Sequence, residues 1–289
     1  MYRPRVSHAK VLYQRDGRIA RITLNRPEVR NAIDDELPVA LADAVARANA
    51  DADAHVIILS GAGKSFSTGY DLTYYAQASG GQATQPMPWD PMKDYAAMMR
   101  NTELFMSLWR SHKPVIARVH GHAVAGGSDI ALCCDLIVMA DDARIGYMPA
   151  RVWGCPTTAM WIYRLGAEKA KRMLFTGDTV DGREAEAMGL IYKAVPPAEL
   201  DGFVDALAQR MATVPQNQLM MQKLVINQAL ENMGLRTTQM IATVFDGITR
   251  HSPEGVHFKE RAEAVGWKQA VDERDRGTFD WTANRPIEP

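Results

Sequence analysis

Three short apolar runs, separated by stretches with helical spacing, most constrain the fold of this chain. The runs are "HVIILSG" (55–61), "KPVIARVHG" (113–121) and "CDLIVMAD" (134–141). Short apolar segments of this kind are typical of buried strands. Leucine and alanine recur at helical spacing over 35–51, and a helix is expected to begin at Gly126. Strands that alternate with helices predict an α/β fold built from βαβ units.

The two ends of the chain have different patterns. Two alternating runs flank Asp16-Gly17, which predicts a β-hairpin near the N-terminus. From about Glu168 onward the pattern is nearly all helical, with helices expected over 182–189, 198–213, 216–232, 235–250 and 254–272. Residues 77–92, rich in Gly, Gln and Pro, predict a mobile loop. We therefore expect an α/β core over residues 1–200 and a helical region over 201–289.

Composition limits the classes of binding partner and the cellular compartment that we expect. The chain has 289 residues, 47% of them hydrophobic, and a net charge of −1. That apolar content is enough for a substantial core, whereas a near-neutral chain gives little support to nucleic-acid binding. The absence of a long apolar stretch argues against a membrane span, and the first residues lack the apolar middle of a signal peptide. The three cysteines do not show the spacing of a disulfide framework, which favours reduced thiols and a cytoplasmic location.

Histidines and cysteines do not form a clear metal-ligand pattern. His120 and His122 are two residues apart, and no third ligand follows at a recognisable spacing. We therefore expect no metal site.

Two glycine-centred turns each follow a predicted strand. They are "KSFSTGYDL" (64–72) and "HGHAVAGGSD" (120–129). If both turns face one cleft, the backbone N–H groups of Tyr70 and Gly126 could bind one oxygen together, as in an oxyanion hole. The alternative is that Gly69, Gly126 and Gly127 serve only close packing of backbone against backbone.

Asp129 lies three residues after Gly126, on the same face of the expected helix. An acid in a first helical turn interacts favourably with the helix dipole, which is one explanation of its presence. The other explanation is a role in proton transfer. The sequence pattern alone leaves both open.

Four stretches together resemble the crotonase superfamily, the enoyl-CoA hydratase/isomerase family, in order and spacing. They are "ITLNRPEVRNAID" (22–34), "SFSTGYDL" (65–72), "PVIARVHGHAVAGGSDIALCCDLIVMADDARIG" (114–146) and "GAEKAKRMLFTGDTVDGREAEAMGLIYKAVP" (166–196). The likeness runs from about Val11 to Arg261. It implies a crotonase-like spiral core of ββα repeats and a C-terminal helical trimerisation region.

The resemblance also implies a ligand and an assembly. The substrate would be an acyl-CoA thioester, with coenzyme A as part of the substrate and no separate cofactor. The chain would form a homotrimer or a dimer of trimers. The family's oxyanion hole maps onto the N–H groups of Tyr70 and Gly126. Substrate contacts map onto Tyr70, Asp71, Leu72 and Thr73, and onto the loop from Arg26 through Arg30 to Ala32. We expect further substrate contacts at Gly126, Gly127, Tyr147, Ala150, Arg151 and Trp153.

The chain departs from the family pattern at its acids. Hydratases of this family use two glutamates; the first falls at Asp129 and the second near Ala150. Two-carboxylate hydration therefore cannot be carried over unchanged. Asp129 becomes the acid/base candidate, with Tyr147 or Arg151 assisting or serving structure only. Trp153 packs in the core or forms a wall of the acyl pocket.

These observations lead to a ranked set of functions. The first is an enoyl-CoA hydratase or isomerase that stabilises a thioester enolate. The absent second glutamate favours a related isomerase, decarboxylase or C–C hydrolase. An acyl-CoA binding protein with little activity is the third alternative.

Overall fold

A computed structural model describes residues 9–77 and 85–287 of the chain. Its main sheet has six strands in the order β1-β2-β3-β4-β6-β9, and all pairs are parallel except β1 with β2. A second sheet has the order β5-β7-β8. The strands are β1 Val11–Asp16, β2 Ile19–Leu24, β3 Val56–Gly61, β4 Val115–Val119, β5 His122–Val124, β6 Leu136–Ala140, β7 Arg144–Gly146, β8 Thr179–Asp181 and β9 Lys193–Val195.

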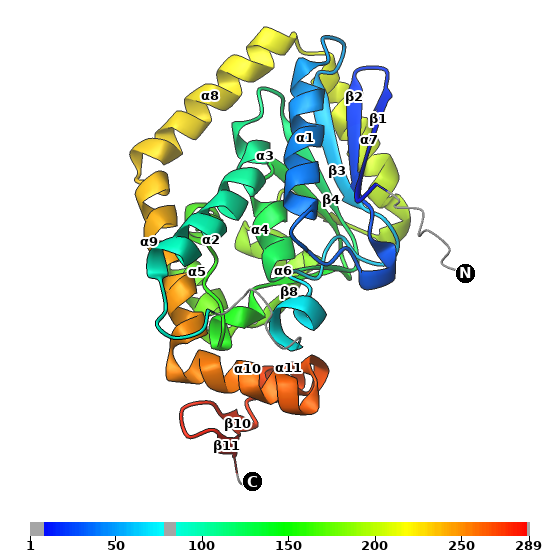
Figure 1. Ribbon diagram of the computed structural model, residues 1–289. Coiled ribbons are helices and arrows are strands. Elements are labelled where there is room, and N and C mark those ends of the chain that lie inside the picture. The colour runs from blue at the N-terminus through cyan, green and yellow to red at the C-terminus, as the bar shows by residue number, and fades with distance from the viewer. Residues whose placement is uncertain (1–8, 78–84, 288–289) are drawn as a thin grey trace, which may run out of the picture.

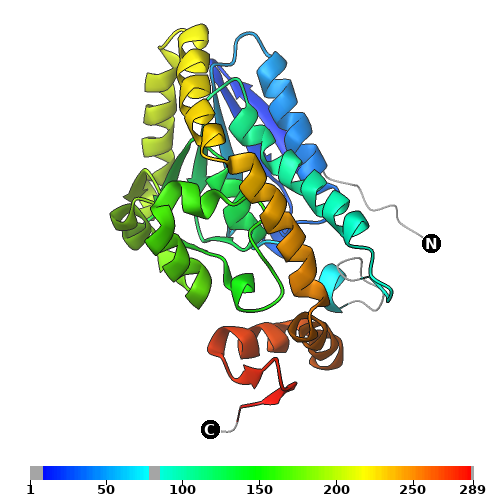
Figure 2. The same ribbon diagram turned by 90° about the vertical axis from the view of Figure 1, so that its left-hand side faces the viewer.

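The helices surround these sheets and extend away from them (Figures 1 and 2). The α-helices are α1 Leu37–Ala50, α2 Pro91–Phe105, α3 Ser107–Arg110, α4 Gly126–Leu132, α5 Met160–Thr176, α6 Gly182–Met188, α7 Leu200–Ala212, α8 Gln216–Asn232, α9 Leu235–His251, α10 Pro253–Val265 and α11 Trp267–Arg276. Short helical segments of other types are η1 Pro27–Val29, η2 Thr73–Gln77, η3 Met148–Arg151 and η4 Pro197–Glu199. A small hairpin pairs β10 Phe279–Asp280 with β11 Arg285–Pro286.

The chain alternates between the two sheets in a repeated ββα unit. Strand β4 lies in the main sheet, β5 in the second sheet, and α4 follows; β6, β7 and α5 repeat this order. The α/β class, the N-terminal hairpin and the three buried strands predicted from the sequence are confirmed. In the hairpin, Asp16 pairs with Ile19 and Gly17 has a positive φ of 54°.

One hydrophobic core holds the sheets together. The strand β3 is buried at Val56, Ile57, Ile58 and Leu59 because helices cover the main sheet. Helix α7 contacts β2, β3, β4 and β6, and its buried side chains belong to the same cluster. The predicted boundary at residue 200 therefore does not separate two hydrophobic cores.

The part of the chain from about Glu168 onward differs from the sequence prediction in two respects. The helix expected over 254–272 is two helices, α10 and α11, because Gly266 has φ 87° and ψ 146°, which lie outside the helical range. Strands β8 and β9 interrupt a region predicted to be nearly all helical. They are too short for period-two alternation to be visible.

Helix α2, beginning at Pro91, was not predicted, and residues 78–84 of the predicted 77–92 loop lie outside the described residues.

Within the described segments, each helix is either too short or too polar to cross a bilayer.

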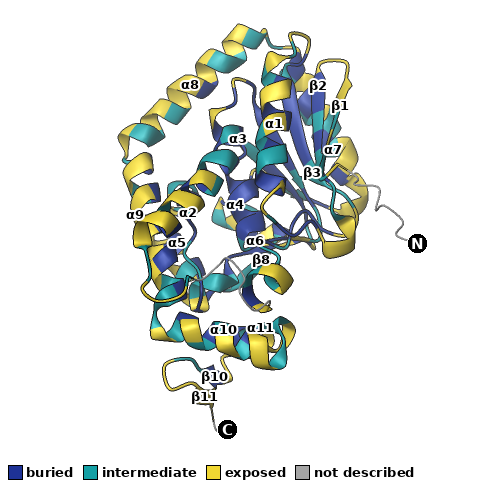
Figure 3. Ribbon diagram, in the orientation of Figure 1, coloured by how far each residue is buried: buried dark blue, intermediate teal, exposed yellow. Residues whose placement is uncertain are grey.

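Helix α8 carries a buried lysine that binds the core. The Lys223 ammonium donates to the Asp135 carboxylate at 2.7 Å and to the Leu108 and Lys113 carbonyls at 3.0 and 3.2 Å. Much of the rest of α8 is exposed (Figure 3). A buried ion pair is therefore one of the contacts that hold this long helix, together with the hydrogen bond from the Asn227 amide to the Trp109 carbonyl at 2.9 Å.

We expect Lys223→Met to lower the free energy of unfolding by about 3–5 kcal/mol, because the substitution leaves the Asp135 carboxylate without its buried cation. Urea unfolding measures the change. In the control Lys193→Met, which breaks a half-exposed pair with Glu186, the loss should stay below about 1 kcal/mol. Equal losses in the two variants would contradict this assignment.

Candidate functional site

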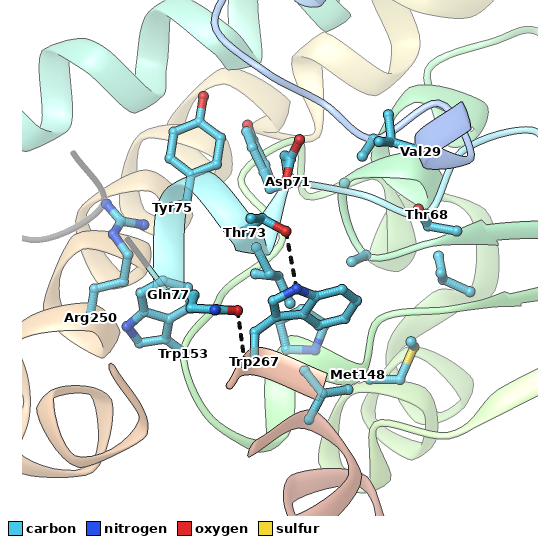
Figure 4. A pocket seen from close by; sticks show the side chains of 18 of the residues that line it. Val29, Thr68, Asp71, Thr73, Tyr75, Gln77, Met148, Trp153, Arg250 and Trp267 are labelled. Carbon is cyan, nitrogen blue, oxygen red and sulfur yellow. Dashed lines mark hydrogen bonds between the residues drawn. The ribbon is translucent and has the colours of Figure 1, made fainter. Parts of the chain in front are cut away.

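A cavity of about 1060 Å³ lies between the sheets and the C-terminal helices (Figure 4). Its walls come from segments that are far apart in the sequence. The residues that line it include Arg30, Ala32, Tyr70, Asp71, Leu72, Thr73, Asp94, Met98, Asn101, Gly126, Asp129, Tyr147, Trp153, Thr157, Asp246, Arg250 and Trp267.

The two glycine-centred turns meet at this cavity. Ser67 forms a parallel bridge with Ala123, which brings the turn after β3 alongside β5. Gly69 has φ 84°, and a Cβ at this position would lie 3.0 Å from the backbone nitrogen of Gly126. The backbones of the two turns therefore approach as closely as a residue without a side chain allows.

Hydrogen bonds fix the direction of the Tyr70 N–H group. The Gly69 carbonyl accepts from the Ile33 N–H at 2.8 Å, and the Asp71 N–H donates to the Ile33 carbonyl at 2.9 Å. In a trans peptide the C=O and N–H groups point in opposite directions. Because the Gly69 carbonyl points toward Ile33, the N–H of Tyr70 points away from it.

The same reasoning fixes the Gly126 N–H group. The Ala125 carbonyl accepts from the N–H groups of Ser128 and Asp129, at 2.9 and 3.3 Å, so it points into α4. The N–H of Gly126, on the same peptide unit, points out of the helix N-terminus. Ala125 has φ 51°, an unfavourable conformation for a residue with a side chain. The turn is thus held in a strained geometry at the cavity wall.

Gly127 allows the start of α4 to pack closely against the backbone of Ser67. It does not appear among the described cavity-lining residues, and a Cβ there would overlap the Ser67 carbonyl. For this glycine the structure favours the close-packing explanation.

Asp129 is in the first turn of α4, and only 3% of its surface is exposed. The Thr158 hydroxyl donates to its Oδ1 atom at 2.7 Å. Burial is the main cause that raises the pKa of Asp129 to about 7; the Thr158 hydrogen bond opposes the rise, and the negative charge of Asp246 adds to it. A cavity-lining carboxyl group of this pKa exchanges its proton near neutral pH.

Most of the predicted thioester and coenzyme A contacts line the cavity. These are Arg30, Ala32, Asp71, Leu72 and Thr73. Arg26 is different, since it is absent from the described lining. Its guanidinium contacts the Ala32 carbonyl and lies 3.4 Å from carboxylate oxygens of both Asp34 and Asp71, so it braces the loop.

Among the predicted site residues around η3, some line the cavity and others do not. Tyr147 and Trp153 line the cavity and are at least nine-tenths buried. Ala150 packs against the core instead, and the Arg151 side chain lies against Gly177 and donates to the Arg274 carbonyl at 3.4 Å. Ala150 and Arg151 are not among the described lining residues.

Sequence reasoning missed several charged residues of the cavity, among them Asp94 of α2, and Asp246 and Arg250 of α9. The signal was present, because Gln239, Thr243, Asp246 and Arg250 recur at helical spacing on the buried face of α9. The sequence analysis did not single these residues out, because polar residues on a helix usually face solvent. The described residues contain no group of three His, Cys, Asp or Glu side chains arranged as metal ligands.

The chain is similar to proteins of a known enzyme family. Residues 14–270 match the enoyl-CoA hydratase/isomerase family. The chain belongs to the enoyl-CoA hydratase/isomerase family. The crystal structure of an enoyl-CoA hydratase from Mycobacterium smegmatis superposes with a TM-score of 0.88 at 45% identity, covering 97% of each chain.

Two further members of the enoyl-CoA hydratase/isomerase family support the assignment. An enoyl-CoA hydratase/isomerase from Xanthobacter autotrophicus Py2 superposes with a TM-score of 0.83 at 28% identity, over 94% of this chain and 99% of that one. The (E)-benzylidenesuccinyl-CoA hydratase of Thauera aromatica is 33% identical, over 68% of this chain and 73% of its own. The crotonase-type fold and an enzyme of the lyase or isomerase type are thereby confirmed.

The raised pKa of Asp129 predicts a pH-dependent stability. Folded Asp129 keeps its proton up to about pH 7, whereas the unfolded side chain releases it near pH 4, so the folded state binds more protons between these values. Asp129 therefore makes the free energy of unfolding fall as pH rises from about 4 to 7. The variant Asp129→Asn lacks this contribution.

We expect Asp129→Asn to gain stability relative to wild type as pH rises, by on the order of 4 kcal/mol across that window. Urea unfolding at several pH values measures the difference. The exposed Asp142→Asn serves as control and should follow the wild type. Parallel stability curves for wild type and Asp129→Asn would show that Asp129 has an ordinary pKa.

Proposed function

We propose that this protein binds an acyl-CoA thioester and stabilises its enolate between the N–H groups of Tyr70 and Gly126. The observation that carries the proposal is that both groups line one cavity, one turned away from Ile33 and the other out of the α4 N-terminus. A thioester oxygen that gains negative charge would accept both hydrogen bonds. Each such donor contributes about 3 kcal/mol to transition-state stabilisation.

In this proposal Asp129 moves the proton. A general acid or base is most effective when its pKa lies near the working pH, and a value of about 7 meets that condition. The hydroxyl of Thr158 orients the carboxyl group. Tyr147, buried beside the same cavity, would assist by hydrogen bonding to the substrate or to water.

A single carboxylate can complete a hydration. Asp129 takes a proton from water as the water oxygen bonds to the β-carbon of the enoyl group, and the C=C electrons move onto the thioester. The carboxyl group then returns the proton to the α-carbon, the enolate collapses, and Asp129 is again ionised. The net change is addition of water. This route needs no acid at Ala150, and the same proton transfer without water gives double-bond isomerisation.

The coenzyme A part of the substrate would lie along Arg30 and Ala32, with Arg26 holding that loop in place. The proposed chemistry uses the thioester and the chain's own groups, and calls for no separate cofactor.

Asp129→Asn tests the mechanism. We expect kcat/KM for crotonyl-CoA hydration, followed by loss of absorbance of the conjugated thioester, to fall at least about 100-fold because the proton carrier is lost. Binding of butanoyl-CoA should change little. Asp142→Asn is the control and should retain full activity. If Asp129→Asn hydrates crotonyl-CoA at the wild-type rate, Asp129 has no part in the reaction.

The exposed face of α8 and α9 supports a proposal about assembly. Apolar side chains on these two helices and in the turn between them are between 41 and 70% exposed: Met221, Leu224, Val225, Ile226, Met233, Met240, Ile241, Val244, Phe245 and Ile248. An apolar surface of this extent is typical of a subunit interface. We propose that copies of this chain associate through it as a homotrimer or a dimer of trimers.

Light scattering tests the assembly. Three copies of the 32.0 kDa chain give about 96 kDa, and a dimer of trimers gives twice that mass. We expect the double variant Leu224→Arg/Val225→Arg to lower the mass toward one chain, because it places charge on the proposed interface. The control Lys169→Glu, on α5, should keep the wild-type mass. A monomeric wild type would disprove the proposal.

A further inference from the structure

The segment that joins η3 to α5 has a strained backbone. Trp153 has φ 78° and Ala159 has φ 56°, conformations that cost free energy for residues with a side chain. Between them, residues 155–158 belong to no helix or strand. A backbone of this kind keeps one conformation only where contacts from the surrounding structure hold it.

Side chains of α2 and α9 hold this segment by hydrogen bonds. The bonds join the Thr102 hydroxyl to the Thr157 hydroxyl at 2.7 Å, the Cys155 N–H to Asp246 at 2.9 Å and the Gln239 amide to the Thr158 carbonyl at 3.0 Å. The two helices thus fix the segment near its beginning and at its end.

Gln239 is connected to Asp129 in two steps. Its amide donates to the Thr158 carbonyl, and the hydroxyl of the same threonine donates to Asp129 Oδ1 at 2.7 Å. Gln239 and Thr158 are 1% and 0% exposed, and neither is among the described residues that line the cavity. An effect of Gln239 on the reaction would therefore pass through the groups that it holds.

The Thr158 hydroxyl opposes the effect of burial on Asp129. A hydroxyl that donates to a carboxylate stabilises the ionised form, so this bond lowers the pKa that burial raises. A hydrogen bond weakens steeply as its geometry departs from the ideal. The position of Thr158 therefore influences the pH at which Asp129 is ionised.

Other titratable groups around Asp129 come from several elements. Those whose charges interact with it are Tyr70, Cys133, Tyr147, Cys155 and Asp246. Burial raises the pKa of each of these tyrosines and thiols, which keeps the four groups neutral near pH 7. Asp246, which is paired with Arg250, favours protonated Asp129, whereas the Thr158 hydroxyl favours the ionised form.

We propose that Gln239 is a positioning residue for Asp129, which acts by fixing Thr158 through its backbone carbonyl. This inference rests on the proposed function, in which ionised Asp129 takes a proton from water. With the Gln239 amide in place, the Thr158 hydroxyl stays directed at Oδ1 and the carboxylate keeps one orientation. Without the amide, the strained segment relaxes and the hydroxyl moves away from Oδ1.

The pH dependence of kcat/KM tests the inference. In the wild type, kcat/KM for crotonyl-CoA hydration should rise as Asp129 ionises, with a midpoint near pH 7. Thr158→Val should raise the midpoint by about one pH unit and Gln239→Met by about half a unit, because the ionised carboxylate loses its hydrogen bond. Thr158→Ser keeps the hydroxyl and should retain the wild-type midpoint.

A double variant shows whether Gln239 acts through Thr158. In the presence of Thr158→Val, Gln239→Met should shift the midpoint no further, since both changes affect one connection. Thr243→Val is the matched control: it removes another buried hydroxyl from α9, one that donates to the Gln239 backbone carbonyl at 2.8 Å. Its midpoint should equal that of the wild type. Thermal melting confirms that each variant is folded.

Infrared titration of the Asp129 carboxyl group, assigned by its loss in Asp129→Asn, measures the same midpoints without catalysis. Unchanged midpoints in Thr158→Val and Gln239→Met overturn the inference, even if kcat/KM falls at every pH, because the two residues would then only support the fold. Additive shifts in the double variant overturn it as well. If the wild type does not hydrate crotonyl-CoA, the proposed function fails, and the infrared midpoints still decide whether Gln239 acts on Asp129.

Discussion

The close approach of two backbone turns at Gly69 and Gly126 is the constraint on which the site depends. A parallel bridge between Ser67 and Ala123 aligns the turns, and the lack of a side chain at Gly69 keeps a Cβ away from the backbone nitrogen of Gly126. The same contact joins the turn after β3 to the second sheet. The geometry of the proposed oxygen-binding site is therefore set by main-chain hydrogen bonds of the core, which side-chain rotation does not change.

Much of this arrangement could be predicted from local pattern. Strands β3, β4 and β6 are continuous apolar runs, and Asp16-Gly17 specifies its hairpin through turn chemistry. The two glycine turns were predicted because a strand followed by a glycine turn and a helix is a local signal. Gly266 was missed as a helix break, since an isolated glycine in a helical pattern is often tolerated.

The charged residues that α2 and α9 contribute to the cavity wall could not be predicted in this way. Asp94 and Arg250 are 156 positions apart in the chain, and each belongs to an amphipathic helix whose polar residues could equally face solvent. Only tertiary packing of α2 on α9 brings them together. A sequence shows which residues can bear charge, but burial of such residues depends on partners that a local pattern does not identify.

The segment from Cys155 to Thr158 binds two carboxyl groups of the cavity wall, because the Thr158 hydroxyl donates to Asp129 and the Cys155 N–H donates to Asp246. Asp129 and Asp246 are therefore connected through four consecutive residues. A shift in the backbone of this short segment would move both carboxyl groups relative to the cavity at once.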